Sequence, residues 1–283
     1  MILPDFILPS RAHQHWEYSG IDSPEQCRDR RHFDRYPYTV SYCYNSRGFR
    51  DREWPNSTQE LKQAIWCVGD SFTVGIGSPL EHTWPWLLEN ITKQRTINIG
   101  LDGASNNWIA RKALRIISEI APEFIVLHWS YISRREENFD VASEKNWQQF
   151  YSVVKDKSWP KCAWTEVDQL PQHILNEIYS VHGGLPVTSD ETRILQSINC
   201  SEESDLENTL DCIEQLERVA KHTVLVHSFI PHFVPKKYQG HIESQLSGCI
   251  VSELTQFDFA RDGYHYDIKT SQRFCQQLIG FLN

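Results

Sequence analysis

Short apolar runs alternate with longer amphipathic segments along most of the chain. The runs are rich in β-branched and aromatic side chains, which is typical of buried strands, and they span 64–68, 96–99, 124–129 and 223–229. The segments between and after them carry apolar residues at helical spacing, and the predicted helices span 83–88, 106–121, 203–221 and 270–282. Thr83 is expected to cap the first of these helices, with Pro85 in its first turn. This alternation predicts the α/β fold class, a parallel sheet with helices on its faces.

Residues 1–62 fall outside the alternation and are predicted to form an N-terminal arm packed on a main domain that covers 63–283. Within the arm, Tyr38, Val40, Tyr42 and Tyr44 recur at every second position as in an edge strand, and Gly48 provides a turn after them. We therefore expect the arm to contain a hairpin.

The stretch 133–203 is a second exception and is predicted to be an insertion in the main domain. It contains three tryptophans, Trp147, Trp159 and Trp164, and follows directly after a predicted strand. Open α/β sheets build their sites at the carboxyl ends of strands. The insertion is therefore either a cap over a pocket or a solvent-facing excursion with a small core of its own.

Charge and cysteine usage exclude several classes of function. The formal net charge of -9 disfavours a general nucleic-acid binder, and the basic cluster 28–35 is interrupted by acidic residues, as on a solvated face. The eight cysteines include no C-x-x-C pair, which argues against a zinc ribbon or a redox motif. The first residues lack the features of a signal peptide, and no apolar run has the length of a membrane span. We expect a cytoplasmic protein with no nucleic-acid or membrane partner, and the oligomeric state stays open.

The first predicted strand runs into the sequence Val68-Gly-Asp-Ser-Phe-Thr-Val-Gly-Ile-Gly77, which presents Ser71 at the strand end. A serine here can cap a following helix. The glycines that follow are costly inside a helix, so we interpret Ser71 as a candidate nucleophile.

A candidate base lies near the other end of the chain. Asp262 precedes His265 by three residues in a loop before the last predicted helix. A serine hydroxyl needs a base that takes its proton, and a histidine base needs a carboxylate that fixes its tautomer. This spacing also occurs by chance, and His265 could equally be a surface residue at the start of a helix.

The pairing of the Gly-Asp-Ser block with Asp262-Gly-Tyr-His265 resembles the SGNH hydrolases, also called the GDSL esterase family, over Ile65–Asn283. The resemblance implies a flavodoxin-like three-layer α/β/α sandwich, no cofactor, and ester hydrolysis through an acyl-serine intermediate. It also implies an oxyanion hole formed by the backbone N–H of Ser71 and by that of Gly103, with Gly100 as the next best match.

The third block of the family pattern, G-x-N-D, is missing, since the strand 124–129 is followed by neither the Gly nor the Asn. Either a side chain substitutes as oxyanion donor or the hole consists of backbone groups alone. The candidate side chains are Asn106, Asn107, Ser130 and Arg134. Arg134 could instead pair with Glu136 or Glu137, or contact the substrate together with Asp70 and Trp129.

The sequence thus predicts a serine esterase for short acyl esters, with an acetyl group on a carbohydrate as the favoured substrate because tryptophans can stack on a sugar ring. The nucleophile elbow G-x-S-x-G of the α/β-hydrolases is absent. One alternative is a metal-dependent phosphoesterase, although the spacing of its ligand candidates matches no metal motif; they are Asp70, His128, His227, Asp262 and His265. Another alternative is an inactive relative that binds glycans.

Overall fold

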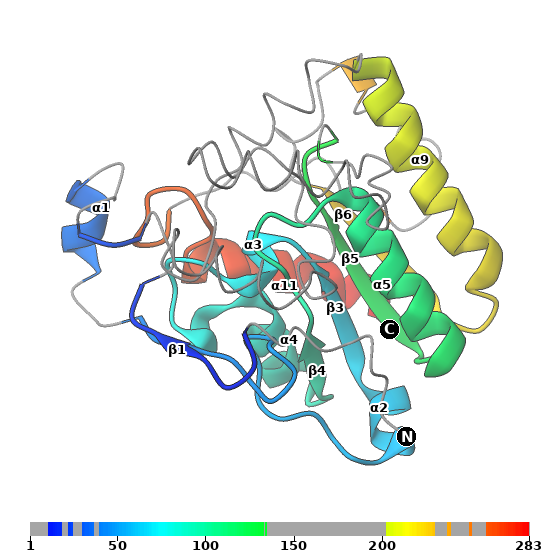
Figure 1. Cartoon of the computed structure of the whole chain (residues 1–283), viewed down its shortest axis with the longest axis horizontal. Coiled ribbons are helices and arrows are strands. Elements are labelled where there is room, and N and C mark those ends of the chain that lie inside the picture. The colour runs from blue at the N-terminus through cyan, green and yellow to red at the C-terminus, as the bar shows by residue number, and fades with distance from the viewer. Residues whose placement is uncertain are drawn as a thin grey trace, which may run out of the picture.

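The computed structural model describes residues 11–18, 22–24, 30–36, 40–132, 134, 202–229, 237–238, 249–250 and 259–282. Nearly all of the predicted insertion 133–203, including its three tryptophans, lies outside these residues. Figure 1 draws the described helices and strands in colour.

The centre of the molecule is a parallel sheet of five strands (Figure 1). In spatial order the strands are β4 (Thr96–Asn98), β3 (Ile65–Gly69), β5 (Phe124–Trp129), β6 (Val224–Phe229) and β7 (Cys249–Ile250). Numbered along the chain, this order is 2-1-3-4-5, as in flavodoxin-like folds. The four predicted strands are confirmed to within one residue at either end, whereas the two-residue strand β7 was not predicted.

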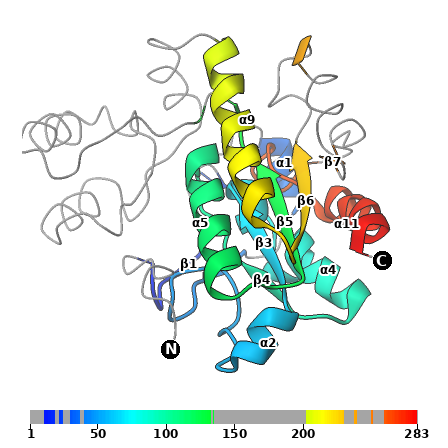
Figure 2. The ribbon, with the colours of Figure 1, turned by 90° about the vertical axis from the view of Figure 1, so that its right-hand side faces the viewer.

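Two pairs of helices cover the two faces of the sheet, as Figure 2 shows. On one face lie α5 (Asn106–Glu119) and α9 (Glu202–Val219), which pack on each other. On the other face lie α4 (Trp84–Thr92) and α11 (Ile268–Leu282). The predicted three-layer α/β/α sandwich is therefore confirmed.

Alternate residues of β3 show why this arrangement is stable. Trp66 and Val68 join the core under α5 and α9, while Ile65 and Cys67 join the core under α4 and α11. All four are fully buried. A strand covered by helices on both sides needs apolar residues at every position, and this explains the continuous apolar run of the sequence.

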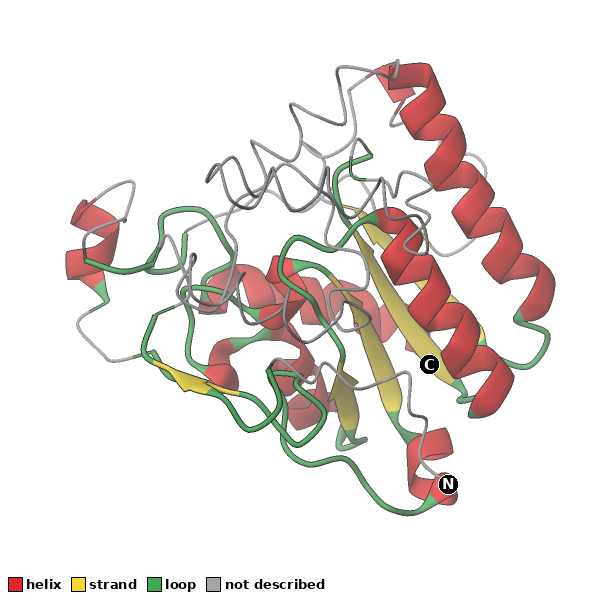
Figure 3. Ribbon diagram, viewed as in Figure 1, coloured by secondary structure: helices red, strands yellow, loops and turns green. Residues whose placement is uncertain are grey.

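The N-terminal arm contributes a small antiparallel pair of strands, β1 (His15–Trp16) and β2 (Tyr42–Cys43), separate from the main sheet in Figure 3. The predicted alternating strand is thus only two residues long, and its partner lies far back in the sequence. The helices α1 (Arg30–Arg35) and α2 (Thr58–Gln63) complete this part of the chain. Among the helices that the structure describes, none is long and apolar enough to cross a membrane.

Candidate active site

Ser71 lies at the carboxyl end of β3, where it opens the one-turn helix α3 (Ser71–Val74). The sequence pattern did not predict this helix. Asp70 is its N-cap and accepts a hydrogen bond from the N–H of Phe72 at 3.1 Å, and Gly75 ends it in the left-handed region with φ of 78°. Ser71 is therefore not the helix cap, and this agrees with the prediction. The glycine-rich stretch was expected to be non-helical, but it begins with one helical turn.

The hydroxyl of Ser71 lies 2.7 Å from Nε2 of His265, although 194 residues separate the two in the chain. Nδ1 of His265 is hydrogen-bonded to Oδ2 of Asp262. The other oxygen of Asp262 accepts the N–H groups of Tyr264 and His265, each at 3.0 Å. The structure thus brings the three predicted residues together, and all three side chains are buried.

The acid–base pair is held in a tight loop ahead of α11. A bridge between Phe259 and Tyr266 closes the loop, and the N–H of Ala260 donates to the carbonyl of His265 at 2.9 Å. His265 is therefore not an exposed residue at a helix start, because the loop and the aromatic rings around it enclose its imidazole. The ring of Phe72 lies 4.5 Å from that of His265, and Tyr264 packs edge-on at 5.0 Å.

Nearby carboxylates control the protonation of this pair. Burial lowers the pKa of His265, but Asp262, and then Asp102 and Asp70, more than offset it and raise the pKa above its ordinary value. Burial also raises the pKa of Asp262, yet His265 and the two backbone N–H groups lower it overall. Asp262 is thus a carboxylate that stabilises the imidazolium form of its neighbour.

The predicted oxyanion hole consists of two backbone N–H groups, those of Ser71 and Gly103. Ser71 is the first residue of α3, so its N–H has no acceptor within the helix. Gly103 adopts a left-handed φ of 75° in the turn after β4, and its neighbour Asp102 is close enough to affect the pKa of His265. The N–H of Gly100, by contrast, donates to Asn98 at 2.8 Å and is unavailable.

The predicted roles of Ser130, Asp70 and Arg134 need correction. Oδ2 of Asp70 accepts the hydroxyl of Ser130 at 2.7 Å and Nη1 of Arg134 at 3.1 Å, and this Nη1 also lies 2.8 Å from Ser130 Oγ. All three side chains are buried. Ser130 therefore donates to Asp70 instead of an oxyanion, Asp70 is a cap and not a substrate ligand, and Arg134 pairs with Asp70. Glu136 and Glu137 lie outside the described residues.

The two candidate asparagines are also engaged elsewhere. Nδ2 of Asn106 donates to Thr209 at 3.0 Å and to the carbonyl of Tyr131 at 3.2 Å. The amide of Asn107 exchanges hydrogen bonds with that of Asn208 at 3.0 and 3.1 Å. Both side chains join α5 to its surroundings, so neither is an oxyanion donor.

Trp129 was expected to contact the substrate, and this expectation is corrected as well. Its side chain is fully buried, and its indole N–H donates to Nδ1 of His227 at 3.0 Å. The ring therefore belongs to the core under α9.

The set of residues proposed as metal ligands does not converge on one point. His128 packs under α11, where Ser228 and Tyr266 contact its ring nitrogens and burial lowers its pKa to about 3. His227 faces the opposite side of the sheet and bonds to Glu217 of α9 at 3.0 Å. Over the parts of the chain that the structure describes, no three His, Cys, Asp or Glu side chains could hold a metal ion together.

Sequence reasoning missed the aromatic surroundings of His265 and the contribution of the arm. Phe72, Tyr264 and Tyr266 flank the predicted serine and histidine directly in sequence, and this adjacency was an available signal. Arg50 of the arm donates to the carbonyls of Val74 and Gly75 just after the serine helix, at 3.1 and 2.6 Å, and no local pattern marks it.

No family model and no curated protein match the sequence. Several solved structures are similar in fold at very low identity. One is a protein from Desulfitobacterium hafniense DCB-2 assigned to the G-D-S-L lipolytic family, with 10% identity, 76% of this chain and 97% of that chain covered, and a TM-score of 0.41. Another is a carbohydrate acetylesterase family member from Sinorhizobium meliloti, with 12% identity, 78% of this chain and 97% of that chain covered, and a TM-score of 0.38.

A third is the psychrotrophic esterase EstA from Pseudoalteromonas sp., with 9% identity, coverage of 78% and 96%, and a TM-score of 0.41. At such identities and scores these solved structures carry no conclusion about activity, so the function proposed below rests on the geometry of the site.

Proposed function

We propose that the protein is a serine ester hydrolase of the SGNH type. The observation that carries this proposal is the alignment of Ser71, His265 and Asp262, with a nucleophile-to-base distance of 2.7 Å between groups from opposite ends of the domain. A histidine held between a serine hydroxyl and a buried carboxylate is the arrangement that activates a serine for acyl transfer.

In the acylation step, His265 Nε2 takes the proton of Ser71 while Oγ attacks the carbonyl carbon of the ester. Asp262 keeps the imidazole in the tautomer whose Nε2 is free to accept, and it stabilises the imidazolium that forms. The tetrahedral intermediate then collapses, the ester C–O bond breaks, and His265 returns the proton to the departing alcohol.

In the deacylation step, a water molecule takes the place of the alcohol. His265 removes a proton from this water as its oxygen attacks the acyl-serine carbonyl, and then returns the proton to Ser71 Oγ as the carboxylic acid leaves. The same base thus serves both half-reactions, and the reaction needs no cofactor.

We assign the oxyanion to the backbone N–H groups of Ser71 and Gly103. Donors placed in advance where negative charge develops contribute most to acyl transfer. Asn106, Asn107 and Ser130, three of the side chains considered as a third donor, are engaged elsewhere, which supports a hole of backbone groups.

The favoured substrate is a short acyl ester. The partly exposed ring of Tyr264 packs edge-on against His265 at 5.0 Å, and we infer that it restricts the acyl group beside the base to a small one. An acetyl group on a carbohydrate remains our proposal for the natural substrate; the tryptophans that suggested sugar stacking lie outside the described residues.

A fluorophosphonate probe followed by peptide mapping tests the proposal on the full chain. We expect labelling at Ser71 and turnover of p-nitrophenyl acetate, both lost in Ser71→Ala. Ser118→Ala is the matched control, because Ser118 lies exposed on α5, and it should behave as wild type. Labelling at another serine would contradict the assignment, and a wild-type chain with neither labelling nor turnover would favour an inactive binding protein.

A further inference from the structure

The loop that follows the serine helix is where the N-terminal arm meets the catalytic residues. Gly77 lies in this loop with a φ of 77°. A Cβ at this position would come within 3.0 Å of Oδ1 of Asp262 and within 2.9 Å of Cβ of Ala260. The loop thus touches the carboxylate that orients His265, and only glycine fits there without moving it.

A closed ring of four hydrogen bonds surrounds this contact. The N–H of Gly77 donates to the hydroxyl of Tyr42 at 2.7 Å, and this hydroxyl donates to Oδ2 of Asp22 at 2.5 Å. The same carboxylate oxygen accepts Nη2 of Arg261 at 2.9 Å. The backbone N–H of Arg261 donates to the carbonyl of Gly77 at 3.1 Å, and this bond closes the ring.

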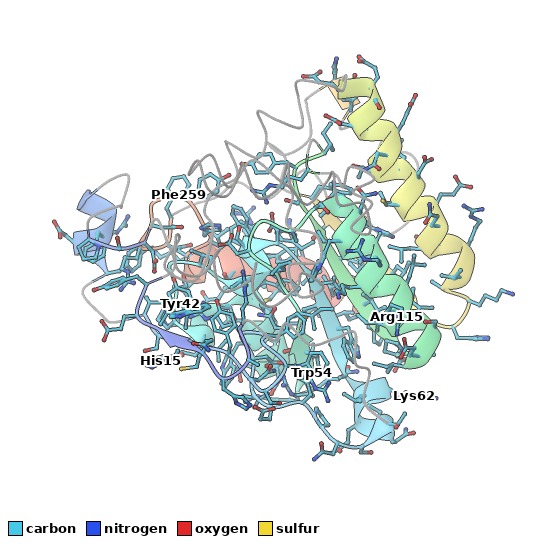
Figure 4. All side chains as sticks on the ribbon, viewed as in Figure 1. His15, Tyr42, Trp54, Lys62, Arg115 and Phe259 are labelled. Atoms are coloured by element: carbon cyan, nitrogen blue, oxygen red, sulfur yellow. The ribbon has the colours of Figure 1, made fainter. Side chains whose placement is uncertain are left out.

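The ring joins three separate parts of the chain. Asp22 and Tyr42 belong to the arm, Gly77 follows the nucleophile, and Arg261 directly precedes Asp262. The three side chains of the ring are buried, and the Arg261–Asp22 ion pair lies out of solvent. In Figure 4, Tyr42 of the arm and Phe259, where the acid–base loop begins, lie toward the same end of the molecule.

A second arm residue strengthens the attachment. The guanidinium of Arg50 is buried over the ring of Tyr42, with its carbon 4.3 Å from the ring centroid. It donates to the carbonyls of Val74, Gly75 and Ser78 at 3.1, 2.6 and 2.7 Å. The chain that leaves the nucleophile helix is therefore held by the arm over several consecutive residues.

We propose that Tyr42 and Asp22 are positioning residues of the active site, which set the distance between Ser71 and His265 by tying the loop after the nucleophile to the loop of the base. This inference rests on the proposed esterase function. A loss of alignment of about 1 Å can cost about a hundredfold in rate, so breaking one bond of the ring should be visible in turnover.

Two buried tyrosines of the arm provide a matched pair of variants. Tyr42→Phe removes the hydroxyl that joins Gly77 to Asp22 and keeps the ring under Arg50. Tyr44→Phe removes a hydroxyl that is buried without a hydrogen-bond partner within the described structure. Ester turnover should be measured per active site, titrated with the fluorophosphonate probe, at a temperature well below the melting temperature of both variants.

We expect Tyr42→Phe to lower kcat per titrated site at least about tenfold, with KM changed less than threefold, and Tyr44→Phe to match the wild type. A merely structural role would reduce the number of titratable sites and leave the kcat of each unchanged. The acid-side midpoint of the pH profile should also shift to lower pH in Tyr42→Phe. A less well placed Asp262 stabilises the imidazolium of His265 less, and this lowers the pKa of His265.

Equal kcat per site in wild type, Tyr42→Phe and Tyr44→Phe would overturn the inference and leave the esterase proposal intact. A wild type without labelling or turnover would instead defeat the esterase proposal, and the inference with it. If Tyr42→Phe does not fold, Asp22→Asn takes its place, since it keeps the size of the side chain and removes the charge that Arg261 faces. The kcat per titrated site and the pH profile of Asp22→Asn then test the inference in the same way.

Discussion

At the scale of single residues, the proposed chemistry depends on a serine and a histidine that are both buried and in direct contact. Burial alone would make the histidine a weak base by favouring its neutral form. Asp262 reverses this effect, so the base is stronger than a free histidine and is kept in one orientation.

Removing the nucleophile is the most direct test at this scale. Ser71→Ala should lower ester turnover by about three to six orders of magnitude, because the hydroxyl that forms the acyl intermediate is gone. Its melting temperature should stay within a few degrees of wild type, since the side chain contributes little to the core. Steady-state kinetics and thermal unfolding of the same preparation measure both. Residual activity above about one part in a hundred would point to another nucleophile.

The pH dependence follows from the raised pKa of His265. Only the neutral imidazole accepts the proton of Ser71, so kcat/KM should rise with pH through a midpoint above about 6.5, the ordinary value for histidine. By the same linkage, protonated His265 stabilises the fold at low pH, and this stabilisation is lost as the pH rises through the raised pKa. A midpoint at or below about 6.5 would contradict the raised pKa of His265.

At the scale of elements, the site is assembled where the carboxyl ends of neighbouring parallel strands meet. Asp70 follows β3, and Ser130 and Arg134 follow β5, so their network joins the ends of two adjacent strands just beneath the nucleophile. Burial raises the pKa of Asp70, and the facing guanidinium opposes this shift. Arg134 therefore offsets part of the cost of burying this capping carboxylate.

Arg134→Gln should destabilise the protein by about 3 kcal/mol, because it removes the charged partner of a buried carboxylate. The loss should shrink at acid pH, where Asp70 takes up a proton. Arg218→Gln is the matched control, since Arg218 and Glu214 form an exposed pair at 3.8 Å, and it should cost less than about 0.5 kcal/mol. Urea denaturation of both variants measures the difference. Equal costs would show that the buried pair contributes no more than the surface one.

At the scale of the whole molecule, the fold separates its buried histidines from one another. His128 lies in the layer of α4 and α11, and His227 lies in the layer of α5 and α9. Among the buried histidines that the structure describes, only His265 comes from a loop that reaches the proposed nucleophile. Of these three histidines, one is thus placed to exchange protons with a substrate.

Prolonged treatment with EDTA should consequently leave the turnover of p-nitrophenyl acetate unchanged, because each proposed step uses only Ser71, His265, Asp262 and backbone N–H groups. The chain should also fail to hydrolyse bis-p-nitrophenyl phosphate. Activity that chelation removes and a divalent ion restores would favour the phosphoesterase alternative. The Ser71→Ala variant, assayed in parallel, shows how much turnover is background.

The sequence by itself determined four of the five described strands of the sheet, its main helices and the three residues of the proposed catalytic centre. Strands and helices follow from the local periodicity of apolar residues, which is set by burial on one or both faces of an element. Ser71 follows a predicted strand and His265 precedes a predicted helix. At both places the apolar periodicity ends and glycines occur nearby, so both residues could be recognised in the sequence. The one-turn helix α3 escaped this reasoning because a cap by Asp70 and a left-handed Gly75 outweigh poor helix propensity over so few residues.

Only the tertiary structure decided which polar side chains are free to act. Asn106 and Asn107 follow Gly103 closely in the sequence, and Trp129 and Ser130 stand at the end of β5, where the family pattern has its third block. Partners from other elements engage all four side chains. The ring of Asp22, Tyr42, Gly77 and Arg261 joins residues up to 239 positions apart. A hydrogen bond between distant residues produces no periodic pattern in the sequence. Its net contribution to the free energy of folding depends on which groups the fold buries beside it.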